Sequence, residues 1–235
     1  MSAVDACAQA IQASILEGSP AAGERLPPER ELAATFGVGR ATVRSALGRL
    51  ATRGLLEVRQ GSGYAVRDFR RVGGMELLPQ LAKLSDERGE LAIAQELLRV
   101  RRHLAAALVE RLRETGPLDL SEASAAVDAL EACASEGASL SELADADLDI
   151  IAALLEASGS VPLQLCFNPL MQVVHAMPRL RAAIYGAPET NVAAYRALLA
   201  ALGSGTAPAD PLALLEARDQ HTLVALAQTA ERDRS

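Results

Sequence analysis

Arginine and hydroxyl side chains recur along one face of a helix that we predict over residues 40–53. These side chains are Arg40, Thr42, Arg44, Ser45 and Arg49. A guanidinium can donate two parallel hydrogen bonds to the edge of a guanine base, or it can pair with a phosphate. Such a face is typical of a helix that enters the major groove of DNA with its N-terminal end first.

The charge distribution separates this face from an ordinary solvated helix surface. From Gly39 to Arg71 the chain has eight arginines and two acids, whereas the whole chain has a net charge of −7. A basic segment in an acidic chain is typical of a protein that contacts DNA. We therefore favour DNA contact over the alternative, in which these arginines only solvate a helix.

The neighbouring residues predict the elements that would hold this helix in place. A short helix opens at Pro27 and Pro28, because proline fits the first turn of a helix. Gly37 and Gly39 then turn the chain into the second helix, whose apolar residues recur at helical spacing. An amphipathic helix over residues 4–16 completes a three-helix core.

Two short strand patterns follow the helices, at residues 55–58 and 64–67. A glycine-bearing loop joins them, which predicts a β-hairpin, and its glycines would let the backbone approach DNA closely. The loop residues predicted to contact DNA are Arg59, Gln60, Gly61 and Gly63. Helix, tight turn, helix and hairpin together make a winged helix-turn-helix.

The order of these residues closely resembles the signature of the GntR family of bacterial transcription regulators. The matching residues are Gly23, Leu26, Pro27, Glu29, Arg30, Glu31, Leu32, Val38, Arg40, Thr42, Val43, Arg44, Ala46, Leu47, Leu50, Gly54, Leu55, Gly61 and Gly63. The resemblance implies operator contacts by Arg30, Arg40, Thr42 and Arg44, with Gly61 at the tip of the wing. Many members have serine or threonine at two positions that are Gly39 and Ala41 here.

The rest of the chain is predicted to be an acidic, all-helical domain. It shows no strand pattern, and glycine and proline pairs such as Gly116-Pro117 separate its helical segments. After residue 72 it holds thirteen basic and twenty-three acidic residues, so it would repel DNA. We predict a DNA-binding domain over residues 1–68, a linker over residues 69–74, and an effector-binding and dimerisation domain over residues 75–235.

Two charged residues interrupt apolar stripes in this second domain. Arg101 falls within a helical stripe of leucines and alanines, and Asp147 falls within another. A charge buried at such a position is costly unless it is paired. The two side chains therefore either pair with each other or line a ligand pocket, and we favour the pocket.

The segment from Asp147 to Gly159 resembles the effector domain of the FadR subgroup of the GntR family. Many members of that subgroup hold a divalent metal with one aspartate and three histidines. Here Asp147 and His221 match, whereas Ile151 and Tyr195 stand where histidines are expected. One aspartate and one histidine are too few for tight metal binding, so we predict neither a metal nor a cofactor. The predicted ligand-binding residues are Arg101, Asp147, Tyr195 and His221.

These replacements resemble the fatty-acid-responsive type within the subgroup, as does the segment from Gly73 to Leu84. That type implies a long-chain acyl-CoA as the effector, whose binding releases DNA. Residues 218–223, however, lack the Tyr-Gly before His221 and the Glu-Ser after it that acyl-CoA binding uses there. A small organic acid therefore stays open as the effector.

Composition and missing motifs argue against several other classes of protein. No run of about 18 apolar residues occurs, so no membrane span is expected. The N-terminus lacks a basic start and a continuous apolar region, so we expect a cytoplasmic protein without a secretory signal. No nucleophile elbow, phosphate-binding loop or paired zinc motif is present in the sequence. We therefore expect no enzyme.

These observations together predict a mainly α protein, with an N-terminal winged helix-turn-helix, a small β-hairpin wing and a C-terminal all-α bundle. The predicted function is that of a homodimeric repressor on a palindromic DNA operator, released by an acyl-CoA or a small organic acid. The alternative is a dimeric DNA-binding protein with no effector, which would have no use for Arg101 and Asp147.

Overall fold

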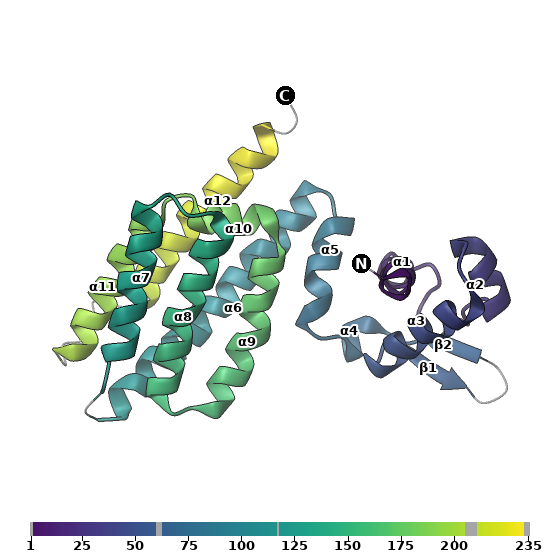
Figure 1. Ribbon diagram of the computed structural model, residues 1–235, viewed down its shortest axis with the longest axis horizontal. Coiled ribbons are helices and arrows are strands. Elements are labelled where there is room, and N and C mark those ends of the chain that lie inside the picture. The colour runs from purple at the N-terminus through teal and green to yellow at the C-terminus, as the bar shows by residue number, and fades with distance from the viewer. Residues whose placement is uncertain (1, 60–62, 117, 205–210, 233–235) are drawn as a thin grey trace. The chain divides into compact units, whose positions relative to one another are not determined.

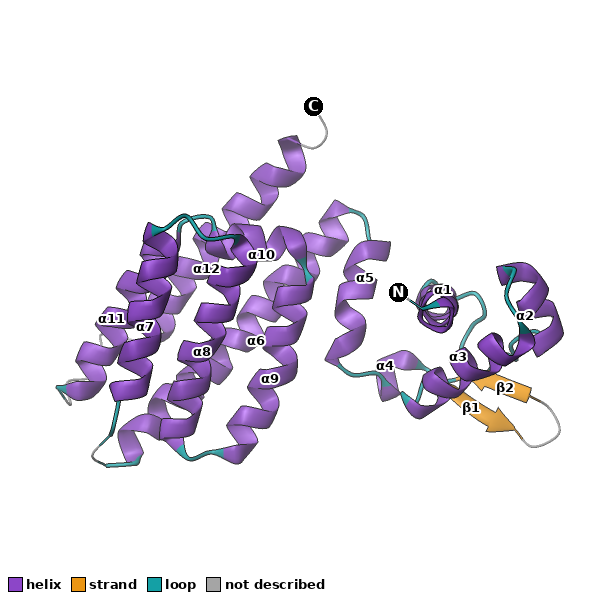
Figure 2. Cartoon of the chain, in the orientation of Figure 1, coloured by secondary structure: helices purple, strands orange, loops and turns teal. Residues whose placement is uncertain are grey.

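The structure is a computed structural model that describes residues 2–59, 63–116, 118–204 and 211–232 (Figure 1). Helices make up most of these residues, and the chain divides into two compact units, Met1–Ser85 and Asp86–Ser235. We call them unit 1 and unit 2. The strands of the described chain lie in unit 1, as Figure 2 shows in orange, so the predicted fold class is confirmed.

Unit 1 begins with the helices α1 (Ala3–Leu16), α2 (Glu29–Phe36) and α3 (Arg40–Thr52). Ser2 and Asp5 form a reciprocal capping box that satisfies free N–H groups at the start of α1. Gly37 ends α2 with φ of 63°, a left-handed conformation that glycine adopts without strain. The predicted glycine turn between α2 and α3 is therefore present.

The hairpin consists of β1 (Leu56–Arg59) and β2 (Gly63–Val66), which pair antiparallel with Leu56 opposite Val66. Each strand is thus displaced by one residue from its predicted position. A backbone segment before α2 also pairs with β2, since the N–H of Leu26 donates to the carbonyl of Tyr64 at 3.0 Å. The wing therefore has a hydrogen-bonded neighbour on the edge of β2.

One hydrophobic core holds unit 1 together. Its fully buried members include Ile15, Val43, Leu47, Leu50 and Leu55, which come from α1, α3 and the residue just before β1. These are the apolar faces that the sequence predicts at helical spacing. The opposite, polar face of α3 consequently points to solvent.

Unit 1 extends beyond the predicted domain boundary. It also contains α4 (Phe69–Val72), a 3₁₀ turn η1 (Met75–Leu77) and α5 (Leu78–Leu84). Leu77 is only 3% exposed, and it belongs to the same core as α1 and α3. A Cβ on Gly73 would lie 2.4 Å from Leu77 Cδ1 and 2.6 Å from the Phe69 carbonyl oxygen. This glycine therefore permits close packing of α4 against η1, where the sequence suggested a linker.

The regular secondary structure described in unit 2 is helical, with short turns and loops between the helices. Its helices are α6 (Glu87–Glu114), α7 (Ser121–Ser135), α8 (Leu140–Ser158), α9 (Val161–Ala176), α10 (Pro178–Tyr185), α11 (Pro188–Gly203) and α12 (Pro211–Arg232). The helix α7 packs along α8 and α11, while α6 packs against α8, α9 and α12 (Figure 1). No described helix is both long enough and apolar enough to span a lipid bilayer.

The core of unit 2 is mostly aliphatic but also holds charged side chains. Leu98, Leu130, Ile150 and Leu170 are at most 1% exposed. Polar and charged residues lie among the buried ones, and they are Arg101, Asp147, Ser158, Asn191, Asp219 and Thr222. Polar groups at such depth require partners, so their contacts indicate where a site could be.

Candidate nucleic-acid interface and buried polar cluster

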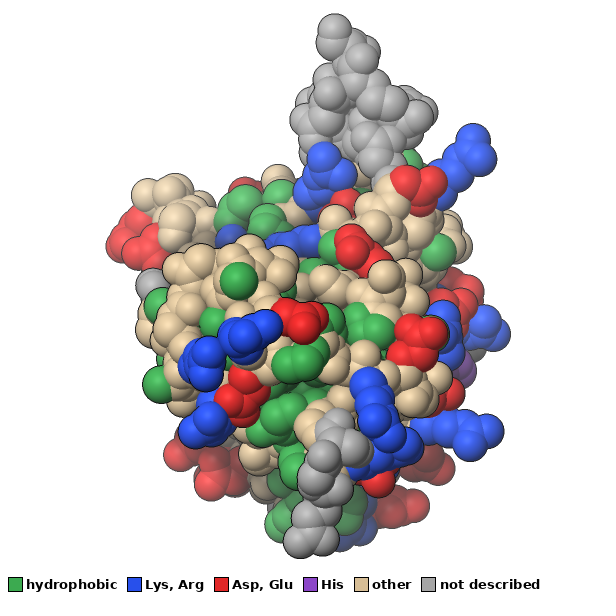
Figure 3. All heavy atoms as spheres, turned by 90° about the vertical axis from the view of Figure 1, so that its right-hand side faces the viewer, with side chains coloured by type: hydrophobic (Ala, Val, Ile, Leu, Met, Phe, Trp, Pro, Cys, Tyr) green, Lys and Arg blue, Asp and Glu red, His purple; other side chains and the backbone are tan. Residues whose placement is uncertain are grey.

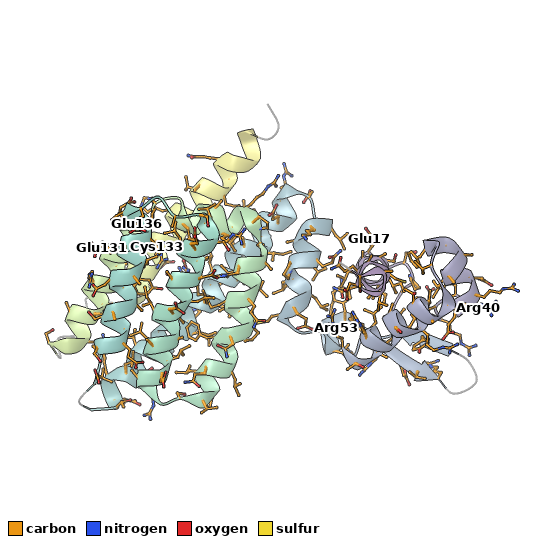
Figure 4. The ribbon with its side chains drawn as sticks, in the orientation of Figure 1. Glu17, Arg40, Arg53, Glu131, Cys133 and Glu136 are labelled. Atoms are coloured by element: carbon orange, nitrogen blue, oxygen red, sulfur yellow. The ribbon has the colours of Figure 1, made fainter. Side chains whose placement is uncertain are left out.

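The N-terminal end of α3 forms an exposed, positively charged surface on unit 1. Arg40 and Arg44 are both exposed, and the first turn of α3 contains no acidic residue. Figure 4 shows Arg40 extending away from the ribbon, and Figure 3 shows basic side chains in blue among acidic ones in red on the face that it presents. Free N–H groups and the helix dipole favour anions at such an end.

Arg44 is held in place by a glutamate on the preceding helix. Its Nη2 donates to Glu29 Oε2 at 2.8 Å, and its Nε donates to Glu29 Oε1 at 3.1 Å. The hydrogen bond from Arg44 lowers the pKa of Glu29 below its ordinary value, so the carboxylate stays ionised at neutral pH. Glu29 therefore orients Arg44 but also adds a negative charge near the predicted DNA contact.

The cap of α3 explains one departure from the family signature. Gly39 is the N-cap residue, and no side chain there accepts a hydrogen bond from the helix. Serine or threonine at this position would supply that acceptor. The first turn of α3 thus keeps free N–H groups that a phosphate oxygen can use.

The other residues predicted to contact DNA differ in their exposure and in their neighbours. Arg30 is exposed on α2, Thr42 is half-buried on α3, and Arg59 is exposed on β1, where Glu57 lies 3.7 Å away. Gly63 begins β2 with φ of 80°. Gln60 and Gly61 lie outside the described residues.

Arg49 differs from the other predicted contacts because it has a partner inside unit 1. Its Nη1 donates to Asp5 Oδ1 on α1. The pair joins the last turn of α3 to the first turn of α1, on the side of α3 that packs against α1. Asp5 is thus an acid in this region whose role the sequence did not reveal.

Unit 2 contains a polar cluster that several helices contribute to. Asp147 of α8 is 1% exposed, and the hydroxyl of Tyr185 on α10 donates to its Oδ2 at 2.9 Å. Burial and then the nearby Asp147 raise the pKa of both Tyr185 and Tyr195, so both phenols are neutral. The Arg218 guanidinium on α12 lies 5.9 Å from the ring centroid of Tyr195.

Arg218 stays protonated beside Tyr195 and Asp147. Burial works against the guanidinium, yet Tyr195 and Asp147 outweigh that effect and raise the pKa of Arg218 above its ordinary value. Burial lowers the pKa of His175 on α9, although Asp147 opposes this, so the imidazole is neutral at neutral pH. The cluster thus combines the Asp147 carboxylate, the Arg218 guanidinium and neutral rings. A second guanidinium, that of Arg181, donates to the His175 carbonyl at 3.3 Å.

Three atoms of this cluster are buried without a hydrogen-bond partner. They are Asp147 Oδ1, His175 Nε2 and Arg218 Nη2. Leaving a buried polar atom unpaired costs about 1–3 kcal/mol, and more when the group is charged. Each of these atoms therefore requires a partner, which a buried water or a bound molecule would supply.

Arg101 pairs with a different aspartate from the one considered in the sequence analysis. Its Nη2 donates to Asp219 Oδ1 of α12, and Arg102 Nη1 lies 3.7 Å from Asp219 Oδ2. Burial raises the pKa of Asp219, while Arg101 and Arg102 act in the opposite direction. The hypothesis of an Arg101–Asp147 ion pair is therefore wrong, because α12 inserts its own aspartate beside Arg101.

His221 also lies away from the cluster. Its side chain is exposed, whereas Asp219 and Thr222 on the same helix are 3% and 4% exposed. A residue two positions after Asp219 points to a different side of the helix. The prediction that His221 joins Asp147 and Tyr195 therefore differs from the structure, and Arg218 contributes from α12 in its place.

The residues around Asp147 do not fit a divalent metal. Within the described ranges, no group of three or more His, Cys, Asp or Glu side chains is arranged to hold an ion. The guanidinium of Arg218 already supplies a positive charge near Asp147, and it would repel a bound cation. The histidine positions of the subgroup are occupied by Ile151 and Tyr195.

The sequence alone did not reveal the contacts of five residues, which are Glu29, His175, Tyr185, Arg218 and Asp219. Arg218 and Asp219 could have been found by the argument applied to Arg101, since both carry charge within an apolar helix. Tyr185 and His175 gave no such signal. They end helices that are short or interrupted by Pro169, where helical spacing predicts burial poorly.

Two family models match this chain. The model described as bacterial regulatory proteins of the gntR family matches residues 4–66, and the FCD domain matches residues 96–209. The first match covers nearly all of α1, together with α2, α3 and the hairpin, and it ends before α4. The second lies entirely within unit 2 and includes Asp147, Tyr185 and Tyr195.

Curated relatives match parts of the chain. It is 40% identical over 112 residues to the HTH-type transcriptional regulator Mce2R of Mycobacterium tuberculosis (strain CDC 1551 / Oshkosh), covering 48% of this chain and 46% of that protein. It is 33% identical over 138 residues to the fatty acid metabolism regulator protein of Cronobacter sakazakii (strain ATCC BAA-894), covering 59% of this chain and 55% of that protein. The chain thus spans about half the length of these relatives.

A solved structure shares the fold over nearly the whole chain. It is described by the words "Lar controls the expression of the Listeria monocytogenes agr system and mediates virulence". The TM-score is 0.58 at 16% identity, and the match covers 99% of this chain and 98% of that one. At this identity the likeness establishes the fold alone.

Proposed function

Because this chain belongs to the GntR family of bacterial regulatory proteins and carries an FCD domain, we propose that it is a cytoplasmic transcription regulator controlled by an effector. Unit 1 would bind the DNA operator, and unit 2 would bind the effector. The observation that carries the proposal is the exposed, acid-free first turn of α3, with Arg40 and Arg44 beside it. The relatives named above are regulators, and we propose no enzymatic activity.

On DNA, the first turn of α3 would enter the major groove. Arg40 would donate to base edges there, and Arg44 would follow one turn later. Arg30, Arg59 and the backbone at Gly63 would hold phosphates on either side, together with Thr42, Gln60 and Gly61. Arg49, engaged by Asp5, would support the packing of α1 on α3 more than it contacts DNA.

The test uses DNA selected from a random-sequence pool with the full-length protein. Arg40→Ala should weaken binding to the selected sequence at least about tenfold, since one bidentate base contact contributes about 1–3 kcal/mol. Arg113→Ala, which removes an exposed arginine from α6 in unit 2, is the matched control and should leave affinity unchanged. Equal affinity of both variants would contradict the assignment of α3 as the DNA-reading helix.

The effector site that we propose in unit 2 is the cluster around Asp147 and Tyr195. Its unpartnered atoms support a bound molecule and count against the alternative of a domain that only dimerises. The name of the Cronobacter sakazakii relative supports an acyl-CoA, whereas the small polar cluster supports an organic acid. We propose that effector binding releases DNA and that the protein acts as a repressor.

The homodimer that a palindromic operator requires would form, we propose, through the exposed face of α9. Residues 157–178 contain no Asp, Glu, Lys or Arg, and Val161 and Leu165 are 60% and 67% exposed. Residues 86–235 otherwise hold twelve basic and twenty-two acidic side chains, so two copies would repel each other elsewhere. An uncharged apolar face is where a second copy meets the least repulsion.

Sedimentation velocity would test this contact between copies. Leu165→Glu places a charge in the proposed interface and should convert the dimer to a monomer at micromolar concentration. Ala132→Glu adds the same charge to an exposed position on α7 and should leave the dimer intact. A dimer that survives Leu165→Glu would exclude this face of α9 as the interface.

A further inference from the structure

Exposed arginines also gather at the C-terminal end of α3, away from Arg40. Arg53 is the C-cap residue of α3, and Figure 4 shows it toward the opposite end of this helix from Arg40. Gly54 follows, and a Cβ there would lie 3.7 Å from Arg67 Nη1 and 3.9 Å from the Val72 carbonyl oxygen. The side chain of Arg67 and the last residue of α4 therefore lie beside the end of α3.

The arginines of α4 enlarge this positive surface. Arg70 and Arg71 are exposed, as are Arg53 and Arg67, and we call these four residues the α3–α4 basic surface. The guanidinium of Arg70 lies over the ring of Phe69, 4.7 Å from its centroid. A guanidinium stacked on a ring can still donate hydrogen bonds from its edge.

The acids near this surface neutralise little of its charge. The Asp68 carboxylate lies 3.8 Å from Arg71, whose side chain is 85% exposed, so this ion pair is weak. Glu76 instead accepts a hydrogen bond from the N–H of Gly74. Within the described ranges, the other three arginines of the surface form no ion pair. Four arginines and one aspartate thus leave a net charge of +3.

The duplex that α3 reads would not reach this surface. The helix has 13 residues, and each residue advances it by about 1.5 Å, so Arg53 lies about 20 Å from the first turn. The major groove is only about 8.5 Å deep. When the first turn meets the base edges, the C-terminal end of α3 therefore lies well outside the groove and beyond the phosphates that border it.

The chemistry of the surface suits a phosphate backbone better than an acidic protein. A protein–protein interface has an apolar centre. The large apolar residues that are exposed in the described part of unit 1, Val58 and Leu84, do not belong to this surface. Guanidinium groups match phosphate oxygens through two parallel hydrogen bonds, and hydrated cations can bind DNA by releasing its counterions.

We propose that the α3–α4 basic surface binds the phosphate backbone of a second DNA duplex, so that one protein holds two DNA segments at once. The contact is independent of sequence, because phosphates carry no base information. This inference goes beyond the proposed function and takes from it only that the first turn of α3 reads the operator. A protein that holds two segments can pass directly from one to the other.

The main test asks whether protein already bound to its selected operator captures a second duplex. The operator carries a donor fluorophore and is mixed with an equal amount of full-length dimer. A random-sequence duplex with an acceptor fluorophore is then added, and energy transfer reports the ternary complex. We expect transfer with the wild type. Its affinity for the second duplex should fall about 100-fold between about 50 and 200 mM salt, since four phosphate contacts give a slope of about −3.6.

Two double variants of equal charge identify the surface that holds the second duplex. Arg53→Gln with Arg67→Gln should weaken its binding at least about tenfold and reduce the salt slope by about 2. Arg111→Gln with Arg113→Gln removes the same charge from exposed positions on α6 and should leave both quantities unchanged. Both proteins keep Arg40, so both should bind the operator like the wild type, which also verifies that they fold.

The outcomes separate this inference from the proposed function. Absence of energy transfer with the wild type, or equal transfer with the two double variants, overturns the inference. Poly-glutamate that displaces the second duplex at a lower charge concentration than DNA does would assign the surface to an acidic protein, and would overturn it as well. A protein that selects no operator contradicts the proposed function, whereas a reduced salt slope of Arg53→Gln with Arg67→Gln on random-sequence DNA would still support the inference.

Discussion

Unit 1 carries its functional charges on the surface, whereas unit 2 buries them. Arg40 and Arg44 are exposed and solvated, so holding their charge costs little and they are free to exchange partners for DNA. Asp147 and Asp219 are at most 3% exposed, so each must find a partner inside the protein. The surface charges suit a large polyanion, while the buried ones suit a small ligand that completes a hydrogen-bond set.

The largest expected effect comes from breaking a buried ion pair. Arg101→Leu should destabilise unit 2 by about 3–5 kcal/mol, because it leaves Asp219 buried without its main counter-charge. Chemical denaturation followed by circular dichroism would measure the loss. Arg101→Leu with Asp219→Leu should recover much of it, and a double variant as unstable as the single one would contradict the pairing.

Acidification should affect unit 2 through His175. Burial lowers its pKa, so as pH falls below about 6.5 the unfolded chain takes up a proton that the folded protein resists. Stability contributed by the neutral imidazole is therefore present at neutral pH and lost on acidification. Asp145 and Asp147 of α8 oppose this shift, while Arg181 of α10 adds to it.

Thermal melting at pH 7.5 and pH 5.5 would measure the effect of His175. His175→Gln should remove part of the decrease in melting temperature that the wild type shows. His103→Gln, which changes an exposed histidine on α6, should keep the full decrease. Identical pH profiles for wild type and His175→Gln would show that His175 does not titrate differently in the folded state.

Breaking the exposed Arg44–Glu29 ion pair of unit 1 should cost little stability, unlike breaking the buried Arg101–Asp219 pair of unit 2. Glu29→Gln removes the partner of Arg44 at a cost of less than about 1 kcal/mol in stability, because both groups remain hydrated. It should instead tighten non-specific DNA binding severalfold at low salt, since a negative charge leaves the DNA-facing surface. Fluorescence anisotropy with random-sequence DNA would detect this, and unchanged affinity would place Glu29 away from DNA.

The smallest expected effect concerns the cap of α3. Gly39→Ser supplies an N-cap acceptor and should stabilise unit 1 by a few tenths of a kcal/mol. The φ of Gly39 is −69°, and a Cβ there would meet only Thr42 Oγ1 at 3.9 Å, so the change is tolerated. A decrease in melting temperature would show that the free N–H groups of α3 already have other partners.

The two units also differ in how much of their structure could be predicted from the sequence. The winged helix-turn-helix was recognisable because its signature lies in one continuous stretch, and the family and fold class are confirmed. The compact unit that contains it continues to Ser85, because Gly73 permits close packing where the sequence suggests a joint. The individual DNA contacts and the ligand-binding role of Tyr195 stay predictions.

The sequence by itself determined the class of this protein, its mainly helical fold and the helix that would read DNA. Hydrophobic periodicity and turn residues specify secondary structure through a few neighbouring positions, so they can be recognised without a structure. Only the tertiary structure decided that Arg101 meets Asp219, that His221 points outward, and that Arg218 joins Asp147 and Tyr185. These side-chain contacts depend on the rotation and register of helices that are distant in the chain, and only their packing sets both.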